Sequence, residues 1–84
     1  MNQSPVSNQP HHVLDTTGLL CPEPLMMLHN AVRDAAVGET IEVIATDPST
    51  ERDIPKFCTF LGHQLVLHTK RDEKYVYRIT KAGK

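Results

Sequence analysis

The chain alternates between stretches with the apolar pattern of strands and stretches with the apolar pattern of helices. Strand-like stretches, rich in β-branched or alternating apolar residues, cover residues 12–16, 40–46, 64–70 and 75–80. Apolar residues recur at helical spacing in two further stretches, which begin near Pro22 and near Ser49 or Thr50. The pattern therefore predicts the order strand, helix, strand, helix, strand, strand, with a hairpin turn over residues 71–74.

The first predicted helix runs from Pro22 to about Ala36 and stops at Gly38, since glycine commonly ends helices. Pro22 suits the first helical position, because its fixed φ is helical and the N–H that it lacks would be unpaired there. We therefore expect Cys21 at the N-cap. The buried stripe of this helix is predicted to consist of Leu25, Leu28, Val32 and Ala35.

The second predicted helix carries apolar residues at positions i, i+3, i+4 and i+7, namely Ile54, Phe57, Cys58 and Leu61. This spacing places Cys58 on the core face, where a free cysteine usually serves as inert packing. Pro55 should distort the first turn, because it removes a backbone donor. Gly62 should end the helix, and His63 should stabilise its C-terminus.

Strands that are joined by helical crossovers tend to lie parallel, whereas strands joined by a short turn pair antiparallel. Both helices can cover one face of a four-stranded mixed sheet. The predicted fold class is thus α/β, a two-layer sandwich of order βαβαββ. Its first strand-to-helix turn lies at one end of the sheet, where Cys21 would be presented to partners.

The length of 84 residues predicts one small domain over residues 11–84, preceded by a disordered leader over residues 1–10 that is nearly free of apolar side chains. The chain has two cysteines, no signal-peptide pattern and no apolar run long enough to cross a bilayer. These features predict a soluble protein of the reducing cytoplasm, without membrane contact and without a disulfide framework.

The net charge of −1 does not favour nucleic-acid binding, so we expect no direct contact with tRNA. The charge is unevenly distributed: residues 1–50 hold six acidic and one basic residue, and residues 51–84 hold four acidic and eight basic. The basic half is either a solvated hairpin surface, which we favour, or a surface for acidic partners or RNA phosphates. The adjacent His11 and His12 offer no fixed geometry, so we expect no metal there. We also expect no cofactor.

The predicted position of Cys21 favours a reactive thiol. Backbone N–H groups and the positive end of a helix dipole stabilise a thiolate at a helix N-terminus. Pro24 removes one of these donors and leaves mainly the Glu23 N–H, while the Glu23 carboxylate opposes a second negative charge. We therefore expect modest activation. The alternative is a half-buried cysteine that merely caps the helix.

Several residues and short motifs along the chain form a pattern when they are taken together. They are Asp15, Gly18, Leu19, the motif Cys21-Pro22-Glu23-Pro24 with Leu25-Met26-Met27, Asp47-Pro48-Ser49, Asp53-Ile54-Pro55, Phe57-Cys58 and Gly62-His63-Gln64-Leu65. This set resembles TusA (SirA-like) sulfur-carrier proteins over residues 12–80. The resemblance implies the βαβαββ fold and a persulfide carrier. In the family, the cysteine at the position of Cys21 accepts sulfane sulfur from a cysteine desulfurase and passes it to a downstream relay protein; Cys58 is not needed.

In the best-known route of this family the sulfur ends as 2-thiouridine at the tRNA wobble position. The resemblance implies this destination first, with molybdenum cofactor or sulfur oxidation as alternatives. The protein would act as a sulfurtransferase-type relay and not as a stand-alone turnover enzyme. Two other readings stay open: a regulatory interaction module in which Cys21 only caps the helix, and a thiol-redox protein using Cys21 and Cys58. We rank the thiol-redox protein last, because no C-x-x-C motif is present.

Partner contacts are expected near Cys21. Met26 and Met27 flank the buried stripe, and at least one should be partly exposed as an adaptable docking surface, unless both fill core gaps. Many relatives have basic residues where this chain has Leu20, His29 and Asn30. Docking of a desulfurase should therefore rely on apolar contacts or on three other basic residues, Arg33, Arg52 and Lys56.

Overall fold

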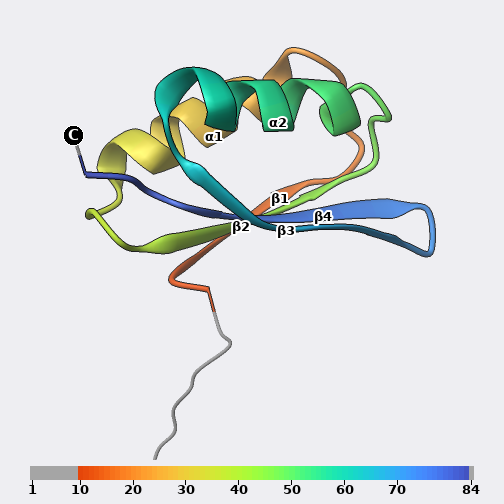
Figure 1. Ribbon diagram of the computed structural model, residues 1–84. Helices are drawn as coiled ribbons and strands as arrows, with labels where there is room; N and C mark the ends of the chain where they lie inside the picture. Colours follow the sequence, from red (N-terminus) through yellow and green to blue (C-terminus); the bar gives the residue numbers. More distant parts are fainter. Residues whose placement is uncertain (1–9, 84) are drawn as a thin grey trace, which may run out of the picture.

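The computed structural model describes residues 10–83, so nearly all of the expected leader lies outside the described residues. The chain forms two helices and four strands (Figure 1), which are β1 (His12–Thr16), α1 (Glu23–Asp34), β2 (Thr40–Ala45), α2 (Thr50–Leu61), β3 (Gln64–Arg71) and β4 (Lys74–Thr80). This order confirms the predicted βαβαββ arrangement.

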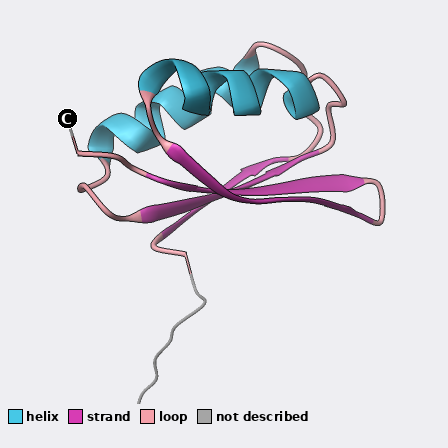
Figure 2. Cartoon of the chain, viewed as in Figure 1, coloured by secondary structure: helices cyan, strands magenta, loops and turns pink. Residues whose placement is uncertain are grey.

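The four strands form one mixed sheet in the order β1-β2-β4-β3. The crossover through α1 leaves β1 parallel to β2, while β4 pairs antiparallel with both β2 and β3. Both helices lie on the same face of the sheet, so that helices form one layer and strands the other (Figure 2). The predicted two-layer α/β sandwich is confirmed.

The core fills the space between the two layers. Alternate residues of the central strands face the helices, and the helices contribute their apolar stripes. The buried side chains are Ile41, Val43, Ala45, Tyr75, Tyr77 and Ile79 from the sheet and Leu28, Val32, Ala35, Ile54, Phe57 and Cys58 from the helical layer. The predicted stripe of α1 is therefore confirmed apart from Leu25, which is half-buried. Leu61 was wrongly placed in the core: this last residue of α2 is 40% exposed and lines an open groove.

The end of α1 differs from the prediction. The helix ends at Asp34, and Ala35 is already extended with φ −80° and ψ 156°. The Lys81 ammonium group donates hydrogen bonds to the carbonyl oxygens of Ala35 at 2.7 Å and Arg33 at 3.4 Å, which satisfies acceptors that a further helical turn would use. Gly38 has a φ of 90° in the loop that follows and does not end the helix itself.

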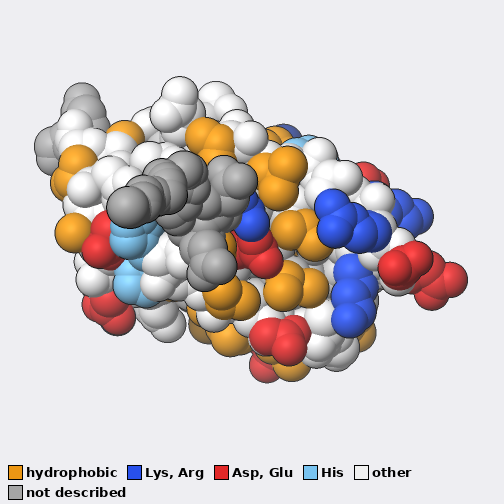
Figure 3. Space-filling view, turned by 90° about the horizontal axis from the view of Figure 1, so that it is seen from below, with side chains coloured by type: hydrophobic (Ala, Val, Ile, Leu, Met, Phe, Trp, Pro, Cys, Tyr) orange, Lys and Arg blue, Asp and Glu red, His pale blue; other side chains and the backbone are white. Residues whose placement is uncertain are grey.

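Gly62 does end α2, with a left-handed φ of 80°, as predicted. The helix is continuous through Pro55. The sheet face without helices carries apolar side chains between charged ones, as Figure 3 shows. Val13 in β1 and Val66 in β3, the two outer strands, are more than half exposed. The side chains of Glu42 and Arg78 form an ion pair at 2.8 Å.

The β3–β4 hairpin has a turn of two residues, Asp72 and Glu73, with φ values of 54° and 66°. Positive φ is strained for residues with a side chain and is free of that strain for glycine. We predict that Glu73→Gly raises the free energy of unfolding by about 0.5–1 kcal/mol, measured by urea denaturation. As a matched control, Glu51→Gly within α2 should lower it by about 0.5–1 kcal/mol. Equal destabilisation by both variants would contradict this interpretation of the turn.

Candidate functional site around Cys21

Cys21 lies in the turn between β1 and α1 and is exposed. The predicted N-cap position is wrong by one residue, because the N-cap is Pro22 and its Cys21–Pro22 peptide bond is cis. The Glu23 N–H donates to the Leu20 carbonyl oxygen at 2.9 Å and closes a turn around the cysteine. Pro24, at the second helical position, is fully buried beneath this turn.

This turn changes the expected environment of the sulfur. The Glu23 N–H was expected to face the thiolate, but it is already paired with the Leu20 carbonyl oxygen. The thiol of Cys21 instead contacts a carboxylate, with Sγ 3.6 Å from Asp53 Oδ2. A hydrogen bond from a thiol to a carboxylate requires the proton on the sulfur. The helix N-terminus therefore does not supply the predicted donor to the sulfur.

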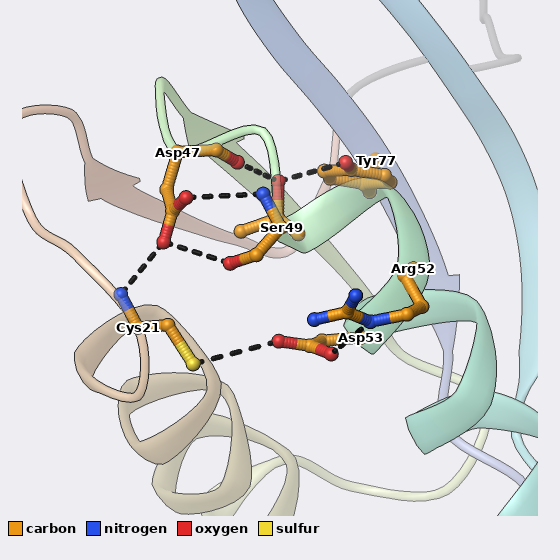
Figure 4. Close-up of polar contacts among 7 residues, drawn as sticks. Cys21, Asp47, Ser49, Arg52, Asp53 and Tyr77 are labelled. Carbon is orange, nitrogen blue, oxygen red and sulfur yellow. Dashed lines mark hydrogen bonds and ion pairs between the residues drawn. The ribbon is translucent and has the colours of Figure 1, made fainter.

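Asp47 fixes the backbone of Cys21 (Figure 4). Its Oδ2 accepts hydrogen bonds from the Cys21 N–H at 2.6 Å and the Ser49 hydroxyl at 2.9 Å, and its Oδ1 accepts one from the Ser49 N–H at 3.0 Å. These bonds, first the one from the Ser49 N–H and then the one from the Cys21 N–H, lower the pKa of Asp47. An ionised, 8% exposed carboxylate thus ties the Cys21 turn to the β2–α2 loop.

The β2–α2 loop is in turn anchored to the sheet. The Thr50 hydroxyl donates to the Asp47 carbonyl oxygen at 2.7 Å, so the Tyr77 hydroxyl, 2.9 Å from Thr50 Oγ1, is the donor in that second bond. Burial raises the pKa of Tyr77 to about 12, which keeps this proton in place at neutral pH. Ser49 is the N-cap of α2, but its hydroxyl bonds Asp47 and makes no capping bond.

Asp53 reaches the sulfur from the first turn of α2. Its other oxygen, Oδ1, lies 3.3 Å from Nε of the neighbouring Arg52. The sequence pattern alone gave neither Asp47 nor Asp53 a role at Cys21. The signal that could have found them is topological: β1 and β2 are parallel neighbours, so the loops after both strands meet at the same edge of the sheet.

Cys58, His63 and His68 make their contacts elsewhere in the structure. Cys58 is 3% exposed, as predicted, and burial raises its pKa to about 11, so it stays an inert thiol. The His63 N–H donates to the Cys58 carbonyl oxygen at 2.9 Å, a backbone bond that does not depend on the imidazole. Burial and then the nearby Lys81 lower the pKa of His63, and its Nδ1 accepts a hydrogen bond from the Ala82 N–H at 3.0 Å, so the predicted interaction of a charged His63 ring with the C-terminus of α2 is not supported. His68 packs against Tyr77 with ring centroids 4.7 Å apart.

Within residues 10–83 no three His, Cys, Asp or Glu side chains are grouped in a way that could hold a metal ion. In the same range, no helix is long and apolar enough to cross a membrane. The described site presents an exposed thiol beside a carboxylate.

The family model described as Sulfurtransferase TusA matches residues 12–81. The chain belongs to the TusA family. It is 64% identical over 69 residues to the sulfur carrier protein TusA of Pseudomonas paraeruginosa, which covers 82% of this chain and 87% of the relative. It is 58% identical over 72 residues to the sulfur carrier protein TusA of Pseudomonas putida strain W619, which covers 86% of this chain and 90% of the relative.

A solved structure shares the fold. The SirA-like protein from Desulfitobacterium hafniense has a TM-score of 0.75 to this chain at 18% identity, over 86% of this chain and 99% of that one. The family resemblance and the fold predicted from the sequence are therefore both confirmed.

The predicted partner residues of this TusA-family chain are exposed for the most part, but Arg33 lies in the last turn of α1, at the far end of that helix from Cys21. Met26 is 58% exposed, whereas Met27 is half-buried. Arg33 and Arg52 have largely exposed side chains, each pairing at 3.3 Å with the aspartate that follows it, and Lys56 is exposed. These residues are thus accessible to a partner; whether they contact one stays a prediction.

An apolar groove of about 700 Å³ runs between α1 and α2. The residues that line it are Leu25, His29, Asp53, Pro55, Lys56, Phe57, Thr59, Phe60 and Leu61. Phe60 is 90% exposed, and the sequence pattern gave it no role. His29 packs edge-on against Phe57 with centroids 4.6 Å apart. Leu25 and Asp53 also line the small depression at Cys21, so the groove adjoins the thiol.

We predict that Asp47→Asn destabilises the protein most near neutral pH. The folded-state pKa of Asp47 is lowered, so its stabilisation is fully present above the unfolded pKa of about 3.9 and is lost as pH falls through the folded pKa. Urea unfolding between pH 7 and pH 3 should show a gap between wild type and Asp47→Asn that narrows on acidification.

Asp34→Asn is the matched control, because Asp34 is an exposed carboxylate whose ion pair with Arg33 is exposed as well. It should follow wild type throughout. Asp15 and Glu39 also have lowered pKa values, but both variants retain them. A constant gap between wild type and Asp47→Asn at every pH would contradict the role of an ionised Asp47.

Proposed function

We propose that this protein is a sulfur carrier that holds sulfane sulfur as a persulfide on Cys21. The observation that carries the proposal is the exposed Cys21 within the motif of a family whose relatives are named sulfur carrier protein TusA. The second cysteine, Cys58, is buried and offers no competing acceptor. A single accessible thiol suits a protein that receives and releases one sulfur atom.

The chemistry requires the Cys21 sulfur to attack the outer sulfur of a donor persulfide. The rate of this exchange depends on the attacking thiolate, on the leaving thiol and on access. Cys21 meets the requirement for access, because it lies on an exposed turn at the edge of the sheet. A carrier must also release its sulfur, and a thiolate that is strongly stabilised would be a weak nucleophile. The contact with Asp53 and the paired Glu23 N–H are consistent with weak stabilisation.

The proposed donor is a cysteine desulfurase, and the proposed acceptor is a downstream relay protein. The surface that would meet them contains Met26, Phe60, Arg33, Arg52 and Lys56, all of which are exposed. Two free cysteines are consistent with a reducing cytoplasm. We propose tRNA 2-thiouridine as the final destination of the sulfur; the thiouridine content of tRNA from a deletion strain, with and without the restored wild-type chain, separates it from molybdenum cofactor and sulfur oxidation.

We predict that incubation with a cysteine desulfurase and cysteine adds one sulfur atom to the wild-type protein, as measured by intact mass. Cys58→Ser should gain the same sulfur, since Cys58 is buried. Cys21→Ser should gain none, because the acceptor thiol is absent. If Cys21→Ser gains as much sulfur as the wild-type protein, the proposed function is contradicted.

A further inference from the structure

The carboxylate of Asp53 contacts the sulfur atom of Cys21. Figure 4 shows its carboxylate directed at the Cys21 sulfur, and Sγ lies 3.6 Å from Oδ2. The side chain of Asp53 is 21% exposed, so it is partly shielded while its partner thiol faces solvent. Asp53 also borders both the depression at Cys21 and the groove between the helices.

The two aspartates at this site have different tasks. Asp47 binds the backbone of Cys21 and the β2–α2 loop, and so holds the turn in place. The Asp53 carboxylate contacts Cys21 Sγ and Nε of the exposed Arg52. Since Asp47 already fixes the turn, the carboxylate of Asp53 is not needed to hold it.

We propose that Asp53 is the proton acceptor and donor for the Cys21 sulfur in both halves of the relay. This inference rests on the proposed sulfur-carrier function. A group that exchanges a proton with a reacting atom must lie within hydrogen-bond reach of it, and Asp53 meets this geometric requirement for sulfur. The neighbouring guanidinium of Arg52 holds the other carboxylate oxygen, which leaves Oδ2 directed at the thiol.

The loading step balances without an added oxidant or reductant. The Cys21 sulfur attacks the outer sulfur of the donor persulfide, a new S–S bond forms, and the S–S bond of the donor breaks. The Cys21 proton passes to Asp53 Oδ2. The donor cysteine leaves with the electron pair of the broken bond and receives that proton. Unloading is the reverse: the acceptor thiol takes the outer sulfur, and its proton returns through Asp53 to Cys21.

The same carboxylate would orient the loaded cysteine. A persulfide anion has no proton to donate, and its outer sulfur carries negative charge, so Asp53 repels it. The outer sulfur would then point away from α2 and toward solvent, where an acceptor can attack it. The charged groups around Cys21 in this argument are Asp47, Asp53 and Arg52 from the β2–α2 segment and Glu23 from α1.

The test compares two rates in Asp53→Asn. The first is single-turnover sulfur transfer from a persulfide-loaded cysteine desulfurase at saturating concentration, which separates the chemical step from docking. The second is alkylation of Cys21 by iodoacetamide across pH, which needs no desulfurase and reports the thiolate. We expect transfer to slow by about tenfold, because the proton acceptor is lost. We expect alkylation at neutral pH to accelerate by about threefold, because the thiolate no longer faces a like charge.

Two further variants serve as controls. Glu51→Gln removes the same charge from the same helix, at a side chain that lies beside His68, and should change neither rate. Asp53→Glu restores a carboxylate and should recover the wild-type alkylation profile and part of the transfer rate. Thermal unfolding of each variant establishes that the fold is intact.

Opposite changes in the two rates support the proposal, since a purely structural role would not separate them. Unchanged transfer in Asp53→Asn, or transfer that rises together with alkylation, overturns it. In either of these cases a sulfur atom that is still acquired by wild type leaves the proposed function standing. Failure of wild type itself to acquire sulfur refutes the proposed function instead.

Discussion

The hydrogen bond from the Cys21 N–H to Asp47 Oδ2, at 2.6 Å, joins two loops that are far apart in sequence. The geometry of the site depends on it. It can form because β1 and β2 are parallel neighbours, so that the turn after β1 and the loop after β2 leave the sheet at one edge. The Asp47 carboxylate also accepts hydrogen bonds from the N–H and the hydroxyl of Ser49. Hydrogen bonds through Thr50 and Tyr77 link the Asp47 backbone to β4. The thiol is thereby held on a fixed turn without burial.

Different residues position Cys21 and contact its sulfur. Asp47 binds backbone and holds the turn, whereas Asp53 meets the sulfur itself. The two cysteines are separated in the same way: Cys58 packs in the core and Cys21 faces solvent. An exposed thiol beside a carboxylate differs from a thiolate held strongly by a helix N-terminus. This environment suits a sulfur atom that must be gained and lost with similar ease.

The fold was predictable because its signals are local. The strand pattern gave β1 with its observed bounds, and Gly62 ended α2 as its conformational freedom suggests. The end of α1 was missed, because Lys81, distant in sequence, takes the last carbonyl groups. The motif around Cys21 correctly identified the family, whereas the site that it indicates stays a prediction. Its neighbour Pro22 took the N-cap because a turn closed by Leu20 and Glu23 precedes the helix, which periodicity does not reveal.

The contacts of the Cys21 sulfur could not be predicted from the local sequence either, because they involve a residue that is distant in sequence. Asp53 reaches Sγ only once α2 packs beside α1. Sequence spacing identifies the core face of a helix but does not say which neighbouring loop faces its end. The chemical class of the site could therefore be inferred from Cys21 and its motif, whereas the carboxylate that faces it could not.

The most direct measurement of the central claim is peptide mass spectrometry on the protein isolated from growing cells and alkylated at once. If Cys21 carries the sulfur, a fraction of its peptide should bear an alkylated persulfide while the Cys58 peptide bears none. A persulfide on Cys58, or none on Cys21 while the desulfurase in the same cells is loaded with sulfur, would contradict the account.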